Sequence, residues 1–270
     1  MNVKYIVTLH GLIGVDKFIS ASDWDKEYEK NFILKSDATQ TPVTVISTGI
    51  KKRIEKYYLK KSSSNIIVIN NGFRFEHVNI NCLNLREYYK IPETAKIAIV
   101  VGSIYNNKNQ IQVVDAMKIL LDRGIKNIYT FFCGMDFTNG ELQKKINELG
   151  LDSRIFVLGF IQHEKMNSIY RQADFNVVAS FNEGFGMSII EAFYNGLPTV
   201  TFSDIDALLD IYDEKAMLLC KTRDTFDFAK TIFKMSELQW DRDWIKKYSN
   251  KFSIENTTNS YIKLYYDFSV

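Results

Sequence analysis

Short apolar runs alternate with amphipathic segments over most of the chain. From residue 96 onward, these runs predict six strands, at residues 97–101, 128–133, 155–158, 175–180, 199–202 and 216–219. The segments between them have helical spacing; the first ends at residue 123, and the next three cover residues 141–149, 164–171 and 188–194. Strands that are apolar throughout and alternate with helices are typical of a parallel sheet covered on both faces. The pattern therefore predicts an α/β fold in which ligands bind beyond the carboxyl ends of the strands.

The first 72 residues show the same alternation with fewer strands. Their apolar runs predict strands at residues 3–9, 42–47 and 65–70, and the intervening segments predict helices at 48–59 and at 23–34, with Asp23 as N-cap. Three strands are few for an independent parallel sheet, which typically has about five or six. We therefore interpret residues 1–72 as the last part of a domain. The end of the chain is expected to be helical, at residues 222–238, 240–250 and 254–268.

The composition is that of an ordinary globular protein. Of the 270 residues, 46% are hydrophobic, so a sizeable core is expected. The formal net charge of +2, from 34 basic and 32 acidic residues, argues against binding to nucleic acid. Cys82, Cys133 and Cys220 have no metal-binding spacing and fit a reducing cytoplasm. No apolar run reaches the roughly 18 residues of a membrane span, so we expect a soluble, cytoplasmic protein.

The turn within residues 181–191 is the first candidate for chemistry. It follows an apolar run and leads into a predicted helix. A strand, a glycine-containing turn and a helix point free backbone N–H groups at an anion. Glu183 and Glu191 bracket this turn, which indicates a ligand with phosphate and hydroxyl groups, such as a nucleotide sugar. Alternatively, Ser188 and Glu191 form a capping box, in which the two side chains satisfy each other's backbone donors and bind nothing.

Further candidate groups follow other predicted strands. They are Gly102, Ser103 and Lys108 after the first strand of the regular part, Gly134 after the second, and Gly159, Phe160 and Ile161 after the third. An ammonium at Lys108 is suited to neutralise a diphosphate, although a solvated loop lysine is the alternative. The glycines either bring backbone groups to a base edge or simply turn the chain. The sequence contains no Gly-x-Gly-x-x-Gly fingerprint after a strand, which argues against an NAD enzyme. It also lacks a Walker A loop and a Gly-x-Ser-x-Gly elbow.

Taken in order, these motifs resemble the retaining GT-B glycosyltransferases, in particular glycosyltransferase family 4, the group 1 transferases. The central match is Glu-Gly-Phe-Gly-Met-Ser-Ile-Ile-Glu at residues 183–191, which resembles the family's Glu-x7-Glu motif. The resemblance extends from about residue 43 to residue 268. It takes in Val-Ile-Ser at 45–47, Val-Ile-Asn-Asn-Gly at 68–72, Val-Val-Gly at 100–102 with Lys108, Val-Leu-Gly-Phe at 157–160 and Gly-Leu-Pro-Thr-Val at 196–200.

The resemblance implies a domain organisation. Residues 73–250 are expected to form a complete C-terminal Rossmann-like domain that binds the donor. Residues 1–72 are expected to be the last part of an N-terminal, acceptor-side Rossmann-like domain, and residues 251–270 a helix that returns towards it. Since the family's N-terminal domain supplies most of the acceptor site, we expect a fragment, a truncated gene product or one half of an enzyme completed by a partner chain. The alternative function is a non-catalytic nucleotide-sugar-binding fragment or subunit.

The resemblance also implies roles for individual residues. Glu183 and His10 are expected at the donor sugar and Lys108 at the diphosphate, and these three are the expected catalytic residues. The remaining site is expected to comprise Glu191 at the ribose, Phe160 and Ile161 at the base, the backbone of Gly184, Phe185, Gly186, Met187 and Ser188 at the sugar and diphosphate, and Gly102, Ser103 and Gly134. Ser103 stands where the family usually has an arginine, so half of the positive clamp on the diphosphate is missing. A histidine at a strand end, such as His10, is more often structural.

The implied reaction is transfer of a hexosyl group from a nucleotide-diphosphate sugar to an acceptor hydroxyl with retention of configuration. The resemblance implies no metal and no cofactor beyond the donor, and a glycan or lipid-linked acceptor, as in cell-surface polysaccharide biosynthesis. Three Asp-x-Asp triplets are interpreted as helix starts (Asp23, Asp241) and a solvated turn (Asp204). The basic segment 51–56 either contacts the inner face of a membrane peripherally or is a solvated surface. An epimerase or a phosphorylase on the same fold is a further alternative.

Overall fold

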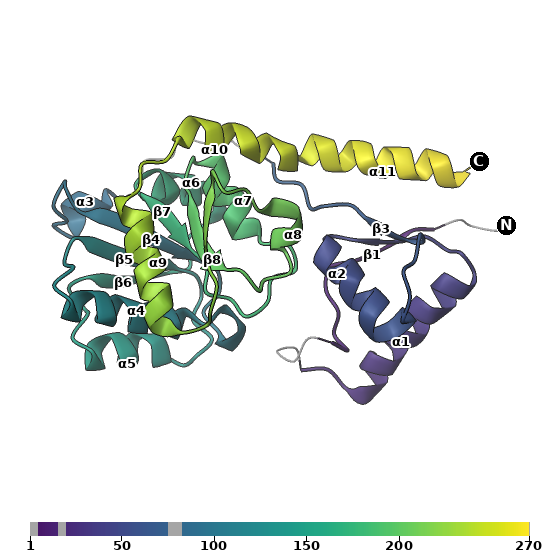
Figure 1. The fold of residues 1–270 in the computed structure, drawn as a ribbon, viewed down its shortest axis with the longest axis horizontal. Coiled ribbons are helices and arrows are strands. Elements are labelled where there is room, and N and C mark those ends of the chain that lie inside the picture. The colour runs from purple at the N-terminus through teal and green to yellow at the C-terminus, as the bar shows by residue number, and fades with distance from the viewer. Residues whose placement is uncertain (1–4, 16–19, 75–82, 270) are drawn as a thin grey trace.

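A six-stranded parallel sheet forms the centre of the larger part of the molecule (Figure 1). The computed structural model describes residues 5–15, 20–74 and 83–269, so Cys82 and the first residues of the strand expected at 3–9 lie outside it. In their order across the sheet, the strands are β6 (Ile155–Gly159), β5 (Ile128–Cys133), β4 (Lys96–Val101), β7 (Phe175–Val177), β8 (Thr199–Phe202) and β9 (Met217–Cys220). The order reverses between β4 and β7, and parallel sheets bind ligands at such a switch point.

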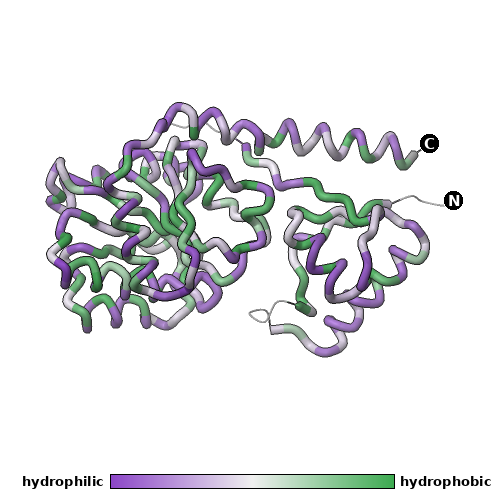
Figure 2. The backbone as a smooth tube through the Cα atoms, in the orientation of Figure 1, coloured by the Kyte–Doolittle hydropathy of each residue, from purple (hydrophilic) through white to green (hydrophobic). Residues whose placement is uncertain are grey.

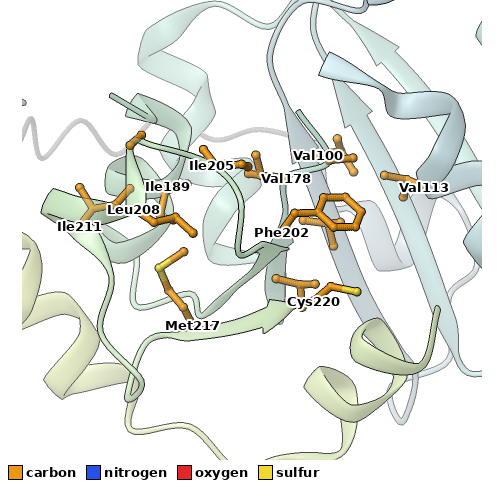
Figure 3. Packing of buried hydrophobic residues seen from close by; sticks show 14 of the residues in the cluster. Val100, Val113, Val178, Ile189, Phe202, Ile205, Leu208, Ile211, Met217 and Cys220 are labelled. Atoms are coloured by element: carbon orange, nitrogen blue, oxygen red, sulfur yellow. The ribbon is translucent and has the colours of Figure 1, made fainter. Parts of the chain in front are cut away.

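Alternate side chains of β4 enter two different hydrophobic clusters. Ala98 and Val100 belong to a cluster with residues of α4 (Gln110–Asp122), α5 (Glu141–Glu148) and α9 (Thr225–Glu237). Ile97 and Ile99 belong to a second cluster with residues of α3 (Leu85–Tyr88) and α6 (His163–Arg171). Figure 3 shows part of the first cluster, around Phe202. Because both faces of the sheet are covered, its strands are apolar at consecutive positions, as Figure 2 shows for the central strands.

The smaller part of the molecule contains a three-stranded parallel sheet. Its strands are β1 (Val7–Leu9), β2 (Val43–Val45) and β3 (Ile66–Val68), in that order across the sheet. Helix α1 (Asp23–Ala38) begins after Ser22, whose side chain accepts from the N–H of Asp25 in a capping box. The prediction of Asp23 as N-cap is therefore wrong by one residue, because Ser22 has the extended backbone that a cap requires and Asp23 is already helical.

The basic segment after β2 departs from the single regular helix that we expected at 48–59. It forms α2 (Thr48–Arg53) and continues as a π-helical turn, η1 (Ile54–Leu59). Ser47 caps α2, and its side chain accepts from the N–H of Ile50. The wider π turn changes which side chains share a face beyond Arg53.

Several contacts join the smaller part to the rest of the molecule. Helix α11 (Ile254–Ser269) runs back over the smaller sheet (Figure 1), and its Thr257 hydroxyl donates to the carbonyl of Asn70 over 2.9 Å. In the larger part, the carboxylate of Asp210, in α8 (Leu208–Ile211), accepts from the N–H and hydroxyl of Thr48 at 2.7 and 2.6 Å. Asp210 therefore places negative charge at the start of α2, where the helix dipole favours it.

The predicted α/β fold with parallel sheets is confirmed. Strands β5 and β8 have the predicted bounds, whereas β7 ends at Val177, three residues earlier than expected. Among the described residues, the remaining α-helices are α7 (Met187–Tyr194) and α10 (Arg242–Ser249), and a short 3-10 helix, η3 (Asn250–Phe252), follows α10. No helix within the described residues is long and apolar enough to cross a membrane.

Candidate active site

The loops after β4 and β7 are joined at the switch point of the larger sheet. The first contains the short helix η2 (Asn106–Lys108), and the second leads from Ser180 to Glu183. The carbonyl of Asn107 accepts from the N–H of Phe181 at 2.8 Å, and the Asn107 side chain donates to the carbonyl of Asn182 at 3.0 Å. These bonds hold together two segments that lie about 75 residues apart in the sequence.

Lys108 and Glu183 form an ion pair at this junction. The Lys108 Nζ lies 2.7 Å from Oε1 of Glu183, and the same oxygen accepts from the Ser180 hydroxyl at 2.6 Å. Glu183 is only 9% exposed, so its carboxylate depends on these two donors in place of water. Lys108 is therefore not the solvated loop lysine of the alternative interpretation. The pair leaves Oε2 of Glu183 without a hydrogen bond from any described residue, available to a ligand hydroxyl.

The amino end of α7 follows Glu183 closely in the sequence, after the segment Gly184 to Gly186. Its N-cap, Gly186, has φ of 85°, a left-handed conformation that glycine adopts without strain, and no side chain caps the helix. No described residue accepts a hydrogen bond from the N–H groups of Met187 and Ser188. These are two of the unpaired donors that begin any helix, and the helix dipole makes them attractive to an anion.

The capping box between Ser188 and Glu191 does not form. The helix begins at Met187, one residue earlier than predicted, so Ser188 is already helical and cannot serve as the N-cap. Instead, Oε2 of Glu191 accepts from the hydroxyl of Tyr170 at 2.9 Å. The alternative interpretation of this turn is therefore wrong, because Glu191 points across to α6.

Glu191 is half-buried, and its carboxylate contacts the Tyr170 hydroxyl. Burial raises the pKa of its carboxyl group above the ordinary value of 4.5, and the hydrogen bond from Tyr170 and the charge of His163 act in the opposite direction. Tyr170 is fully buried, and burial, reinforced by the negative charge of Glu191, raises the pKa of its hydroxyl. A carboxylate held in this way by one phenol has further lone pairs with which to accept from a pair of vicinal hydroxyls.

The ends of β4 and β5 approach each other closely. A side chain on Gly134 would place its Cβ 2.0 Å from the carbonyl oxygen of Gly102, so only glycine fits there. A Cβ on Gly102 would lie 3.7 Å from Cε of Lys108, which shows that the lysine stem lies over Gly102. Ser103 follows directly, and its carbonyl accepts from the Gln110 side chain at 2.9 Å. These residues thus lie beside the Lys108–Glu183 pair.

The other predicted residues lie on either side of this centre. Phe160, beyond β6, is 68% exposed, whereas Ile161 packs against the cluster that contains Tyr170. His10 directly follows β1 in the smaller part, and its carbonyl oxygen would lie 3.2 Å from a Cβ on Gly184. The His10 backbone is therefore placed against the loop that carries Glu183. Phe185 contributes only backbone to this surface, because its ring is buried and packs edge-on against Phe252.

Sequence reasoning did not identify three residues that position this site. In the sequence, Tyr170 occupies an apolar position of a predicted helix and Asn107 lies in a predicted loop. Neither residue has neighbours that indicate a role in the site. Ser180 is different, since a hydroxyl that ends a buried strand three residues before Glu183 is recognisable as a partner for it. Among the Asp-x-Asp residues, Asp204 pairs with Arg223 and Asp206 with Arg53, so this turn is ion-paired and not merely solvated.

The segments that follow β4 and β7 at the switch point of a parallel sheet carry the Lys108–Glu183 ion pair, the uncapped start of α7 and the half-buried carboxylate of Glu191. Polar groups at such a switch point are typical of nucleotide-binding α/β proteins. The sequence signature of the family "Glycosyl transferases group 1" matches residues 81–252. The chain therefore belongs to the glycosyl transferases of group 1.

Individual relatives are more distant. A mannosylfructose-phosphate synthase from Agrobacterium fabrum is 30% identical over 112 residues, which are 39% of this chain and 25% of the relative. A glycosyltransferase structure from Rickettsia africae has a TM-score of 0.78 at 20% identity and covers 99% of this chain and 71% of its own. Anabaena Alr3699/HepE in complex with UDP also has a TM-score of 0.78, at 16% identity, covering 97% of this chain and 72% of its own. These likenesses identify the GT-B fold.

The chain is shorter than these relatives. It spans 25%, 44% and 66% of the lengths of three curated relatives that it matches.

Proposed function

We propose that the chain binds a nucleotide-diphosphate sugar at the switch point and transfers the sugar to an acceptor hydroxyl with retention of configuration. The observation that carries this proposal is the Lys108–Glu183 ion pair beside the uncapped start of α7. Positive charge for a diphosphate and a carboxylate for sugar hydroxyls are thereby adjacent. Membership of the group 1 family supports the same reaction class.

Lys108 and the amino end of α7 would bind the diphosphate of the donor. Lys108 contributes its ammonium, and Met187 and Ser188 contribute backbone N–H groups from which no described residue accepts a hydrogen bond. Ser103 offers a hydroxyl in place of an arginine, so the charge on the diphosphate is balanced mainly by the lysine and the helix.

Glu191 and the loop beyond β6 would bind the nucleoside. The Glu191 carboxylate, oriented by Tyr170, accepts the two ribose hydroxyls. The exposed ring of Phe160 and the neighbouring Ile161 follow the end of β6. A base would stack on the Phe160 ring there or form hydrogen bonds with the backbone, and Gly134, at the end of β5, would line the same edge of the sheet.

The reaction would depend on stabilising the leaving group. As the bond between the anomeric carbon and the diphosphate oxygen breaks, its electron pair moves to that oxygen and the sugar becomes oxocarbenium-like. Lys108 and the α7 donors stabilise the growing negative charge. The acceptor oxygen then bonds to the anomeric carbon on the same face, and its proton passes to the leaving phosphate. Glu183 and the His10 segment position the sugar hydroxyls during these steps.

Calorimetric titration with UDP-, GDP- and ADP-sugars tests donor binding. We expect one nucleotide class to bind, and slow release of free sugar from it, because the donor half of the junction is present in this chain. Where an acceptor is found, the anomeric proton coupling of the product in NMR reports retention or inversion. Binding of none of the three classes contradicts the proposed function, and an inverted product contradicts the proposed stereochemistry.

Removal of divalent metals should leave donor binding and hydrolysis unchanged. Lys108 and the α7 amino end supply the positive charge that a metal would otherwise bring, and Asp204 and Asp206 are each occupied by an arginine. The measurement is the rate of nucleotide release before and after treatment with excess EDTA, followed by Mg²⁺ or Mn²⁺ addition. A loss of rate that either metal restores contradicts metal-independent transfer.

A further inference from the structure

A polar cleft of about 600 Å³ separates α2 from the strand ends of the larger sheet. One wall is the exposed side of α2 and η1, with Lys52, Arg53 and Lys56. The opposite wall is built from the segments after β7, β8 and β9, including Asn182 and Arg223. The cleft is distinct from the Lys108 junction but adjoins it, because Asn182 directly precedes Glu183.

The two arginines are held in place by several partners each. Arg53 donates through Nε to Asp206 at 2.7 Å and through Nη2 to the side chain of Asn182. Arg223 donates to both carboxylate oxygens of Asp204 and to the carbonyl of Ala179. Their side chains are 17% and 25% exposed, whereas the paired aspartates are 45% and 59% exposed. The positive groups are therefore fixed within the cleft, and the negative groups are the more solvated members of each pair.

Lys52 and Lys56 add positive charge that these aspartates do not balance. Other basic residues of the same segment have acidic partners, namely Lys51 with Glu55 and Lys61 with Asp37. Lys52 and Lys56 have no ion-pair partner among the described residues, and both line the cleft. With four basic and two acidic side chains in its lining, the cleft carries a net positive charge of two. Low-dielectric walls around such charges strengthen their attraction for an anion.

We propose that this cleft binds a phosphate or diphosphate group on the acceptor. The phosphate would lie between Lys52 and Lys56 on one wall and Arg223 on the other, next to the loop that carries Glu183. An acceptor held by its phosphate would present its hydroxyl to the donor sugar from the side of α2. The identification of this ligand as the acceptor rests on the proposed function, whereas the anion site itself rests only on the cleft.

Calorimetric titration with inorganic pyrophosphate, with the donor site saturated by the nucleotide that binds, tests the cleft. We expect the Lys52→Ala/Lys56→Ala variant to bind pyrophosphate about tenfold or more weakly than the parent chain, since it loses two ammonium groups that can donate charge-assisted hydrogen bonds to the phosphate. The matched control is Lys30→Ala/Lys60→Ala, which removes the same charge from exposed positions that do not line the cleft. It should bind as the parent does. Equal weakening in both variants, or none in either, overturns the proposal.

Two further arms separate the sources of the phosphate. Vesicles containing phosphatidylglycerol report a membrane-bound acceptor, and a soluble sugar phosphate reports a free one. Either ligand should bind more weakly to Lys52→Ala/Lys56→Ala than to the parent chain and should bind normally to the control. If vesicle binding falls equally in both variants and pyrophosphate does not bind, the segment is only a general basic surface, and the proposal is overturned. Nucleotide binding by the same proteins is scored separately. Its absence from the parent chain contradicts the proposed function, while pyrophosphate binding that depends on Lys52 and Lys56 still supports the cleft.

Discussion

Replacing Lys108 with alanine should lower the rate of donor cleavage by about 100- to 1,000-fold, the usual loss when one group that stabilises developing negative charge is removed. The Lys108 ammonium lies at the switch point, 2.7 Å from Glu183. Ser103 occupies the position where an arginine would share the charge of the diphosphate, so Lys108 has no second cation there to replace it. The measurement is nucleotide release under saturating donor. An unchanged rate would mean that the leaving diphosphate lies elsewhere.

The same substitution should also destabilise the fold by about 1–3 kcal/mol, because it leaves the buried Glu183 carboxylate with only the Ser180 hydroxyl. Urea unfolding of Lys108→Ala and of Lys108→Ala/Glu183→Gln separates the two effects. The second change neutralises Glu183, so it should recover stability but not the rate. Lys118→Ala is the matched control, since Lys118 lies on α4 in an ordinary surface pair with Asp122 and should affect neither quantity.

Replacing Glu191 with alanine should weaken nucleotide binding by about 10- to 100-fold, because hydrogen bonds to a charged group contribute about 1.5–3 kcal/mol. Turnover at saturating donor should fall much less, since Glu191 contacts the ribose in the proposed complex and not the bond that breaks. Titration calorimetry measures the first effect, and the rate at saturation the second. Glu148→Ala, which removes an exposed carboxylate on α5, is the control and should bind normally. Normal binding by Glu191→Ala would exclude the proposed ribose contact.

The half-buried position of Glu191 gives the nucleotide affinity a pH dependence. Burial raises the pKa of Glu191 above 4.5, and the ionised carboxylate is the better acceptor for ribose hydroxyls, so donor affinity should rise with pH as Glu191 ionises. Tyr170→Phe removes the hydrogen bond that lowers this pKa and should move the midpoint of the affinity profile to higher pH. A nucleotide sugar is the suitable ligand because its diphosphate diester does not titrate in this range. Identical profiles in the two proteins would contradict the role of Tyr170.

The ionisation of Glu191 affects folding stability with the opposite sign to its effect on nucleotide affinity. Because the folded-state pKa of Glu191 is raised, the folded chain holds this proton more tightly than the unfolded chain does. The contribution of Glu191 to stability is therefore fully present below pH 4.5 and is lost as the pH rises through the raised value. At low pH, protonated Glu191 should therefore add to the stability of the folded chain, whereas nucleotide binding should weaken.

Local sequence pattern determined the elements of the larger sheet. Its strands could be predicted because both faces are covered, so nearly every residue in them is apolar and the runs are conspicuous against the amphipathic helices. The glycine-containing turn before α7 was also predictable, since a glycine between a strand and a helix supplies the left-handed residue that Gly186 provides. The start of α7 was misplaced by one residue, and that error kept the capping-box interpretation open.

Only the tertiary structure decided which of the candidate residues meet. Lys108 and Glu183 are 75 positions apart, and their contact depends on β7 lying next to β4, an order that strand periodicity does not encode. The partner of Glu191 depends on how α6 packs against α7, and Arg53 reaches Asp206 across 153 positions because α2 docks on the larger part. The sequence thus determined the strand ends at which polar groups lie. The strand order and the packing of the two parts decided their partners, because these arise from contacts between segments and not within them.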